Sequence, residues 1–270
     1  LDVNGANAAN IGTWQRIDIA GTGVTSSGAL FNSSATAASL SIPITLTAAS
    51  TIISTGAGGL TLTGNIVNGG FLLTIDGISA SAITTGVISG SGGLTKAGTG
   101  TLTLSGTNTY TGVTTINGGI LSVATIGNGG VAGNLGQATN VVGNIVLGGG
   151  TLQYTGLTAS TDRAFSLTAA TTSTIDVTTN TLTISGNSGN STSGALTKAG
   201  AGTLILSGTN TYTGINTISA GTLSVSTDRN LGAAPAGVTA TSITLNGGTL
   251  ATTASFTLET KRGITLNSST

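Results

Sequence analysis

Short segments in which apolar residues alternate with threonine or serine recur along the whole chain. Residues 60–63, 101–104, 203–206 and 242–245 read LTLT, TLTL, TLIL and SITL. Alternation at period two predicts β-strands with one buried face, and threonine, valine and isoleucine favour a pleated surface. Each segment ends at glycine, asparagine or serine, which suit tight turns. The pattern therefore predicts an all-β protein built from short strands.

A long motif occurs twice in the chain. Residues 93–123 read GLTKAGTGTLTLSGTNTYTGVTTINGGILSV, and residues 194–225 read GALTKAGAGTLILSGTNTYTGINTISAGTLSV. Lys96 in the first copy matches Lys198 in the second, 102 positions further along. Looser matches connect the sequence around both copies, so no internal domain boundary stands out. We therefore expect one continuous repeat structure over residues 1–270.

The spacing of shorter motifs predicts the size of the repeating unit. LTLTG at residues 60–64 precedes LTKAG at 94–98 by 34 positions, whereas LTISG at 182–186 precedes LTKAG at 196–200 by 14. The additional residues, near 71–90, indicate one inserted coil of about 20 residues, because a solenoid accepts whole coils without losing register. The chain is therefore predicted to be a parallel β-helix of about 13 coils, with three short strands per coil.

The same alternation predicts which side chains fill the core. Residues expected to point inward and to stack on their equivalents in adjacent coils are Leu102, Leu104, Ile116, Leu121 and Val123. The threonines and serines between them are expected to face solvent. Asparagines at the turns are expected to form ladders of hydrogen bonds between coils. These are Asn108, Asn117 and Asn210.

Both copies of the long motif resemble the autotransporter-associated β-strand repeat. That family's pattern is Gly-Leu-x-Lys-x-Gly-x-Gly-Thr-Leu-x-Leu-Ser-Gly, followed by Asn-x-Tyr-x-Gly, Thr-x-Ile and Gly-x-Leu-x-Val. The second copy departs from it at Ala195 and Ala220, where the family favours glycine. The resemblance implies a right-handed parallel β-helix, the passenger domain of a protein exported across the outer membrane of a gram-negative-type cell. Passengers serve as stalks, adhesins or surface layers, and the fold does not fix which.

Composition restricts the partners. Charged residues make up 5% of the chain and the formal net charge is zero, against about 25% charged residues in ordinary globular proteins. This argues against nucleic acid, which needs a basic surface, and against a polybasic membrane patch. No apolar run is long enough for a transmembrane helix, and no signal peptide is visible. The low charge fits an extracellular location.

Candidate chemistry is sparse. Cysteine and histidine are absent, which removes thiolate and imidazole chemistry. The acidic residues are scattered, whereas glycoside hydrolysis needs paired carboxylates on one face. They are Asp2, Asp18, Asp76, Asp162, Asp176, Asp228 and Glu259. We expect no catalytic, cofactor-binding or metal-binding residue, and no enzymatic activity. Calcium-binding GGxGxD nonapeptides are also missing.

Several single residues admit two interpretations. Thr-Asp-Arg at 161–163 and again at 227–229 favours local turn hydrogen bonds over a ligand contact. Lys96 and Lys198 are expected to have a structural or surface role. Tyr110 and Tyr212 are expected to pack at a corner with the hydroxyl in water, rather than to stack on a carbohydrate or partner. Trp14, the one tryptophan, either caps the first coil or contacts a preceding one.

The preferred function is a bacterial surface stalk or adhesin, whose partner is a receptor or glycan on a host or neighbouring cell. The alternative is a self-assembling subunit of an extracellular filament or sheath, whose partners are copies of itself, because open strand edges favour joining. A polysaccharide-active enzyme is a remote alternative. An ice-binding solenoid, suggested by the Thr-x-Thr pairs, is another.

Overall fold

The computed structural model describes residues 1–4, 15–189 and 191–267. Trp14 lies outside the described residues. The chain forms two compact units. Unit 1 comprises Leu1–Ala124 with Gly130–Ala138, and unit 2 comprises Thr125–Gly129 with Thr139–Thr270. Strands within each unit pair in parallel, so the all-β parallel β-solenoid predicted from the sequence is confirmed. One continuous β-helix over residues 1–270 stays a prediction.

The strands of unit 1 are short and follow one another around the coil. They are β1 (Ile17–Gly21), β2 (Leu30–Asn32), β3 (Ala38–Leu40), β4 (Ile44–Ser54), β5 (Leu60–Leu62), β6 (Ile66–Val67), β7 (Leu73–Gly77), β8 (Ser81–Ile83), β9 (Ile88–Ser89), β10 (Leu94–Lys96), β11 (Thr101–Leu104), β12 (Thr114–Ile116) and β13 (Ile120–Val123). A 3-10 turn, η2 (Val24–Ser26), lies between β1 and β2.

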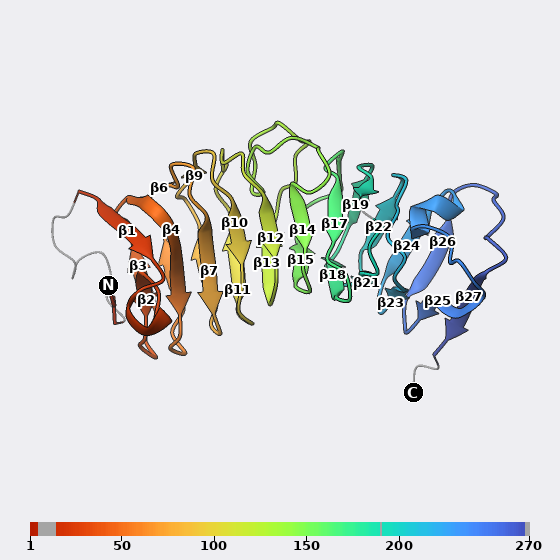
Figure 1. The fold of residues 1–270 in the computed structure, drawn as a ribbon, viewed down its shortest axis with the longest axis horizontal. Helices are drawn as coiled ribbons and strands as arrows, with labels where there is room; N and C mark the ends of the chain where they lie inside the picture. Colours follow the sequence, from red (N-terminus) through yellow and green to blue (C-terminus); the bar gives the residue numbers. More distant parts are fainter. Residues whose placement is uncertain (5–14, 190, 268–270) are drawn as a thin grey trace. The chain divides into compact units, whose positions relative to one another are not determined.

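Three parallel ladders surround the core of unit 1. The first joins β2, the second half of β4, β7, β10 and β12, and several of these strands lie side by side in Figure 1. The second joins β3, β5, β8, β11 and β13. The third joins β1, the first half of β4, β6 and β9. Strand β4 belongs to two ladders because it continues around the corner between them.

Aliphatic side chains stack in columns inside unit 1. Leu40, Leu62, Ile83, Leu104 and Val123 are register partners in successive turns, and each is at most 3% exposed. Each such side chain contributes roughly 1.5–3 kcal/mol on burial. All five residues predicted to point inward are buried, which confirms the alternation: Leu102, Leu104, Ile116, Leu121 and Val123.

Residues 73–89 form one complete turn of unit 1. Strand β7 pairs with β4 and β10, β8 pairs with β5 and β11, and β9 pairs with β6. The origin of this turn as an inserted coil stays a prediction.

The turns that carry the repeat motif differ from the three-strand prediction. After β11, residues 105–113 form no strand, although Asn108 makes an isolated bridge. The Asn108 side chain replaces a ladder contact there, because its Oδ1 accepts a hydrogen bond from the Ile88 N–H at 2.8 Å. A side-chain amide can satisfy a backbone donor as a neighbouring strand would.

Unit 2 also consists of short strands and a 3-10 turn. They are β14 (Ile145–Leu147), β15 (Thr151–Tyr154), β16 (Ala159–Thr161), β17 (Phe165–Leu167), β18 (Thr172–Val177), β19 (Thr181–Ile184), β20 (Ser188–Gly189), β21 (Ala195–Ala199), β22 (Thr203–Leu206), β23 (Asn216–Ile218), β24 (Thr222–Val225), the 3-10 turn η3 (Asp228–Leu231), β25 (Thr239–Leu245), β26 (Thr249–Thr252) and β27 (Arg262–Leu266).

Unit 2 also has three parallel ladders. The first joins β14, β17 and β20. The second joins β15, β18, β21, β23, β25 and β27. The third joins β16, β19, β22, β24 and β26.

Threonines form columns on the outer side of both units. In unit 1 the register partners on the first ladder are Thr51, Thr74, Thr95 and Thr115. In unit 2 the column on the second ladder is longer: Thr151, Thr174, Thr197, Thr217, Thr244 and Thr265. Facing threonines stabilise adjacent strands by roughly 0.2–1 kcal/mol per pair, so the columns support the ladders.

Turn length varies more than the sequence predicted. Leu102 pairs with Leu121, 19 positions further on, whereas Thr217 pairs with Thr244, 27 positions further on. The chain has about 11 turns, fewer than the roughly 13 expected from a constant repeat. The loops account for the difference, because register requires that the strands realign and leaves the connecting loops free to lengthen. Residues 226–238, for example, place η3 between β24 and β25.

Glycines stack at the corner that follows the second ladder of unit 1. A Cβ on Gly86 would lie 2.1 Å from the carbonyl oxygen of Gly64. A Cβ on Gly106, one turn further, would lie 2.3 Å from the carbonyl oxygen of Gly86. Successive turns approach too closely here for any side chain, so this corner requires glycine.

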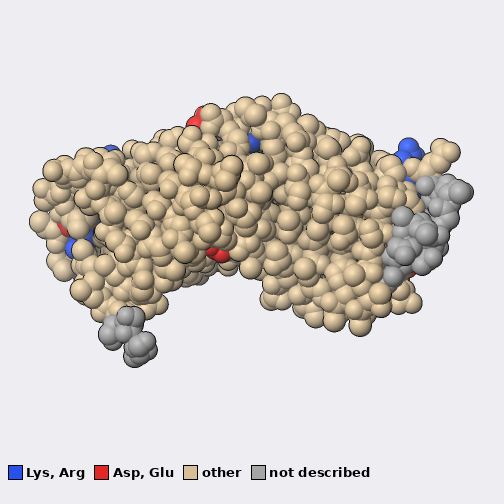
Figure 2. All heavy atoms as spheres, turned by 180° about the vertical axis from the view of Figure 1, so that it is seen from behind, with Lys and Arg blue, Asp and Glu red and all other residues tan. Residues whose placement is uncertain are grey.

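The surface carries very little charge. On the face drawn in Figure 2, almost all described atoms belong to uncharged residues, as expected from a content of 5% charged residues.

Candidate functional site

Lys96 and Lys198 lie inside the coil, at equivalent positions of the two motif copies. Their side chains are 2% and 1% exposed. The alternation Leu-Thr-Lys places each lysine on the same inward side as the leucine two residues before it. Of the two roles that the sequence left open, burial supports the structural one.

Each lysine ammonium donates hydrogen bonds to backbone carbonyl oxygens at a corner of the coil. The acceptors of Lys96 Nζ are Ala97, Gly98 at 3.0 Å and, one turn further, Gly118 at 3.4 Å. The acceptors of Lys198 Nζ are Ala199, Gly200 at 2.8 Å and, one turn further, Ala220 at 3.3 Å. Each lysine therefore ties two successive turns together.

A carboxylate from the preceding turn influences each of these lysines. Burial lowers the pKa of Lys96, and the negative charge of Asp76 offsets part of that effect. Burial likewise lowers the pKa of Lys198, to about 8, against a smaller opposing effect of Asp176. Asp176 accepts a hydrogen bond from Gln153 Nε2 at 2.9 Å through Oδ2, while its buried Oδ1 has no hydrogen-bond partner.

The lowered pKa of Lys198 predicts that stability rises with pH above neutrality. Between pH 8 and 10 the unfolded chain retains the proton that folded Lys198 releases, so the unfolded state binds more protons. The free energy of unfolding should therefore increase by roughly 1–2 kcal/mol over this window. Above pH 10 the buried Tyr212, whose pKa is raised, opposes the gain. Urea titrations at several pH values measure this, and a flat or falling profile from pH 8 to 10 would contradict it.

Two asparagines form a buried amide network in the first motif copy. Asn108 Oδ1 accepts from the Ile88 N–H, and Asn108 Nδ2 donates to the carbonyl oxygen of Asn134, both at 2.8 Å. Asn134 Nδ2 in turn donates to the carbonyl oxygen of Gly106 at 3.0 Å. The network connects a turn to the turns on both sides of it.

The second copy repeats this network. Asn210 Oδ1 accepts from the Ser188 N–H at 2.8 Å, and Asn210 Nδ2 donates to the carbonyl oxygen of Asn230 at 2.6 Å. Asn230 Nδ2 donates to the carbonyl oxygen of Gly208 at 2.9 Å. Hydrogen bonding between coils is thus confirmed for Asn108 and Asn210. The third asparagine named from the sequence, Asn117, is exposed.

The network contains a second repeated element that sequence reasoning missed. Asn134 and Asn230 each begin an Asn-Leu-Gly tripeptide, at 134–136 and 230–232. The tripeptides lie at different distances from the long motif, because the loops before them differ in length. A search for short matches allowing a variable gap would have found them.

Tyr110 and Tyr212 are 0% and 1% exposed, so the expectation of a hydroxyl in water is wrong. The Tyr110 hydroxyl lies 2.7 Å from the Thr114 hydroxyl, and the Tyr212 hydroxyl donates to Asn216 Oδ1 at 2.6 Å. The glycine of the Asn-Leu-Gly tripeptide packs on each ring, where a Cβ would lie within 3.0 Å of ring atoms. Both tyrosines are core residues.

Replacing Asn210 by leucine should lower the free energy of unfolding by roughly 2–4 kcal/mol. The substitution leaves the Ser188 N–H and the Asn230 carbonyl buried without their partner. The exposed Asn117→Leu is the matched control and should change stability by less than about 0.5 kcal/mol. Equal effects of the two substitutions in chemical denaturation would show that the amide network does not hold the turns together.

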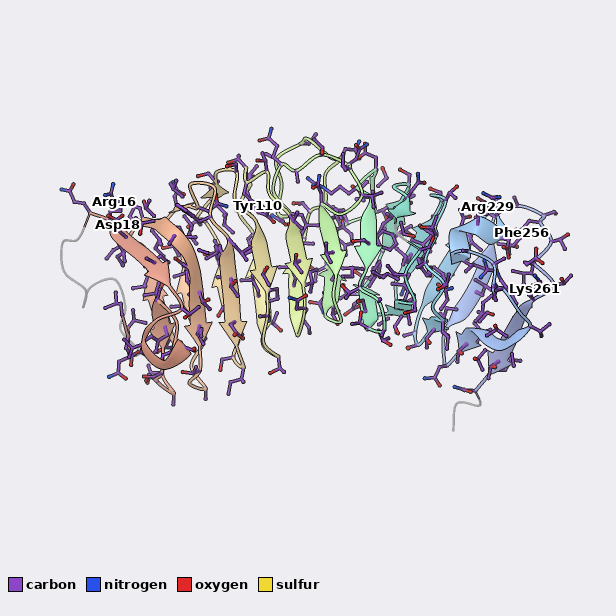
Figure 3. All side chains as sticks on the ribbon, in the orientation of Figure 1. Arg16, Asp18, Tyr110, Arg229, Phe256 and Lys261 are labelled. Carbon is purple, nitrogen blue, oxygen red and sulfur yellow. The ribbon has the colours of Figure 1, made fainter. Side chains whose placement is uncertain are left out.

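The acidic residues named from the sequence lie in different surroundings. Asp2 accepts a hydrogen bond from the Ser33 hydroxyl at 2.5 Å. Asp18 pairs with Arg16 at 2.7 Å on the surface, where both are labelled in Figure 3. Among residues 1–4, 15–189 and 191–267 no group of three or more His, Cys, Asp or Glu side chains could hold a metal ion. The absence of a catalytic or metal site remains a prediction.

Local turn hydrogen bonds, as expected from the sequence, are present at both Thr-Asp-Arg segments: the Arg163 N–H donates to Thr161 Oγ1 at 3.2 Å, and the Thr227 N–H donates to Asn230 Oδ1 at 2.9 Å. The two aspartates also form contacts with distant residues. Asp162 accepts from the N–H of Gly129, 33 positions earlier, at 2.7 Å. Asp228 forms an ion pair with Arg262, 34 positions later, at 2.7 Å. Both aspartates therefore connect different turns of unit 2.

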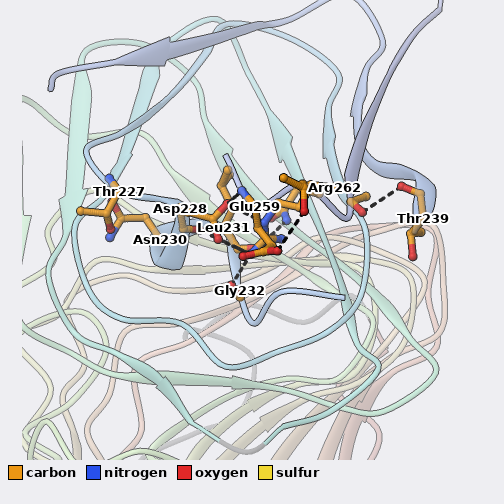
Figure 4. A network of polar contacts seen from close by, with 11 residues as sticks. Thr227, Asp228, Asn230, Leu231, Gly232, Thr239, Glu259 and Arg262 are labelled. Carbon is orange, nitrogen blue, oxygen red and sulfur yellow. Dashed lines mark hydrogen bonds and ion pairs between the residues drawn. The ribbon is translucent and has the colours of Figure 1, made fainter. Parts of the chain in front are cut away.

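Arg262 belongs to the polar network drawn in Figure 4. Its side chain is 2% exposed, and it holds the Asp228 carboxylate through Nε at 2.7 Å and Nη2 at 3.1 Å. Nη2 also donates to the carbonyl oxygen of Gly232 at 2.6 Å. Arg163, which aligns with Arg262 in sequence, is also buried and donates from Nε to Gly127 at 2.9 Å.

Comparison with known proteins agrees with this geometry. A family model described as Passenger-associated-transport-repeat matches residues 94–123 and 196–225, the two segments that carry the buried lysines, asparagines and tyrosines. The chain therefore contains two copies of a passenger-associated repeat. It is similar to "Adhesin BmaC autotransporter" of Brucella suis biovar 1 (strain 1330), with 43% identity over 166 residues. No solved structure matches the chain.

The match spans only a small part of that relative. The match covers 58% of this chain and 5% of the relative, so the chain spans a minor part of the relative's length. Passenger-associated repeats indicate an extracellular location at the bacterial surface. None of the helices in the described part of the chain has the length and apolarity to cross a membrane.

The defining polar side chains of the passenger repeat serve the coil itself. The lysine, asparagine and tyrosine of each copy are buried and hydrogen-bonded between turns or within a corner. A side chain in such a position does not contact a ligand.

Proposed function

We propose that this chain is a non-enzymatic, structural stalk or adhesin region of a bacterial surface protein. The observation that carries the proposal is that the lysine, asparagine and tyrosine of each repeat copy are buried. These side chains stabilise the coil and are not available to a substrate. The similarity to a protein named as an adhesin supports the same function. Its partner is a receptor or glycan on a host or neighbouring cell.

Adhesion of coated beads tests this function. Beads carrying the folded chain should adhere to mammalian cells and to neighbouring bacteria more than beads carrying the heat-unfolded chain. The same preparations should release no product from a panel of polysaccharides. Hydrolase or lyase activity would contradict the non-enzymatic function, and equal adhesion of folded and unfolded chain would contradict specific binding.

A further inference from the structure

Four charged residues gather around one cavity of unit 2, in a chain that has 7 basic and 7 acidic residues altogether. The cavity has a volume of about 320 Å³, and Asp228, Arg229 and Glu259 line it together with Thr209 and Thr211. The fourth charged residue, Arg262, is buried beneath Asp228 and forms an ion pair with it. Charge is therefore concentrated here although it is scarce elsewhere.

The loops that follow the two motif copies differ at the position that supplies the exposed cation. In the first copy the Asn108 N–H donates to the carbonyl oxygen of Gly133, directly before the Asn-Leu-Gly tripeptide. In the second copy the Asn210 N–H donates to the carbonyl oxygen of Arg229, in the same place. Arg229 thus replaces a glycine at a position where the backbone makes the same contact.

The loop before Arg229 is also shorter than its counterpart. Ten residues, 124–133, separate β13 from the first Asn-Leu-Gly tripeptide, and four residues, 226–229, separate β24 from the second. The short loop lies beside Thr209 and Thr211, which line the cavity. Arg229 and Glu259 do not belong to the repeated pattern, so coil building does not explain them.

Two of the four charged residues, Asp228 and Arg262, form an ion pair with each other, and the other two are exposed. Asp228 Oδ1 accepts from Arg262 Nε at 2.7 Å and from the Glu259 N–H at 3.1 Å, so this carboxylate is neutralised and fixed (Figure 4). Arg229 and Glu259 are exposed, and Arg229 is labelled on unit 2 in Figure 3. Within the described residues, no ion pair of the Arg229 guanidinium is found.

We propose that this cavity binds an acidic sugar residue, a sugar ring that carries a carboxylate, at the end of a cell-surface glycan. The Arg229 guanidinium pairs with the sugar carboxylate, because a planar guanidinium matches a carboxylate through two parallel hydrogen bonds. Thr209, Thr211 and Glu259 bond the ring hydroxyls. The proposal rests on the adhesin function proposed above and gives it a ligand class.

The lining favours a sugar over a peptide. Peptide recognition depends on apolar or aromatic anchors that fill a desolvated pocket. Here the side chains that line the cavity are mainly hydroxyl, carboxylate, amide and guanidinium groups, and the apolar ones are the small Ala233 and Ala234. The volume of about 320 Å³ falls at the lower end of small-molecule sites, about 300–1,000 Å³, which suits a single ring.

Binding to a matched pair of glycans tests the proposal. The whole chain is titrated with a glycan ending in glucuronate and with the same glycan ending in glucose, which differ in the carboxylate alone. Arg229→Gly restores the residue of the first copy, so the backbone contact with Asn210 is expected to persist. It should weaken glucuronate binding about ten- to a hundredfold, the loss expected for a bidentate charged hydrogen bond. Lys261→Ala, a neighbouring exposed cation, should leave it unchanged.

The outcomes separate this proposal from the adhesin function. Equal affinity for the two glycans, or unchanged glucuronate binding by Arg229→Gly, overturns the acidic-sugar site. If the chain has equal affinity for the two glycans but coated beads still adhere to cells, the adhesin function stands and the sugar site falls. If the chain binds glucuronate through Arg229 but coated beads do not adhere, the site stands and the adhesin function falls. Thr209→Ala should weaken binding of both glycans if the hydroxyl contacts are real.

Discussion

Replacing Lys198 by methionine should lower the free energy of unfolding by roughly 2–4 kcal/mol. Methionine has a similar length, so it fills the space but donates no hydrogen bond. The carbonyl oxygens of Ala199, Gly200 and Ala220 then lose a donor inside the coil. Asp176, whose Oδ1 already lacks a partner, also loses the cation beside it. A buried group left without its partner is strongly destabilising.

Two comparisons make this result specific. Lys261→Met, at an exposed position, should change stability by less than about 0.5 kcal/mol. Lys198→Met should also abolish most of the stability gain between pH 8 and 10, because that gain comes from the lowered pKa of Lys198. A variant that is as stable as the parent chain and retains its pH profile would show that the lysine does not tie the two turns together.

Replacing Gly86 by valine should destabilise unit 1 by about 3 kcal/mol or more, and it is the substitution expected to have the largest effect. The new Cβ would lie 2.1 Å from the carbonyl oxygen of Gly64, and that atom is backbone held in the adjacent turn. The turn cannot move aside without breaking the ladder contacts on both sides. Chemical denaturation followed by circular dichroism measures the loss.

Milder and matched variants keep this prediction testable if Gly86→Val does not fold. Gly86→Ala should cost about 1–3 kcal/mol, because it introduces the same clash with fewer atoms. Gly237→Ala is the control, since a Cβ there meets nothing within 4 Å. If Gly86→Ala is as stable as Gly237→Ala, the turns are not as closely stacked as described.

Alternation at period two was sufficient to predict the fold class and the core. Leu102 and Leu104 point inward because they alternate with Thr101 and Thr103, and a parallel solenoid repeats that pattern from turn to turn. The number of turns was less accurate. A coil length taken from one spacing assumed equal loops, whereas β23 and β25 enclose η3 and its flanking residues within a single turn.

The polar interior was harder to predict. Lys96 occupies an inward position of an alternating segment, which is the signal that it is buried, but charged residues are rarely buried without partners. Its partners are backbone carbonyls, which no residue pattern identifies. Tyr110 is buried by an Asn-Leu-Gly tripeptide that follows after a loop of variable length. Asp228 and Arg262 are 34 positions apart, so their pairing depends on the turn lengths.

Of the residues around the cavity, Arg229 could be identified from the sequence. Arg229 aligns with Gly133 once the two Asn-Leu-Gly tripeptides are matched, and a difference between repeat copies marks a position that the coil does not constrain. The approach of Glu259 to Asp228 could not be predicted. It depends on the loop between β26 and β27, which follows no repeated pattern.

Cysteine cross-linking between adjacent turns tests the stacking of turns most directly, since the chain has no cysteine of its own. Thr95 and Thr115 are register partners on neighbouring strands of unit 1, where strand spacing of about 4.8 Å suits a disulfide. Thr74 is one turn further from Thr115, at about 10 Å, beyond disulfide reach. Thr95→Cys with Thr115→Cys should therefore cross-link rapidly in the folded chain, and Thr74→Cys with Thr115→Cys should not. Equal cross-linking of both pairs, or of neither, would contradict a parallel solenoid whose repeat motif stacks turn upon turn.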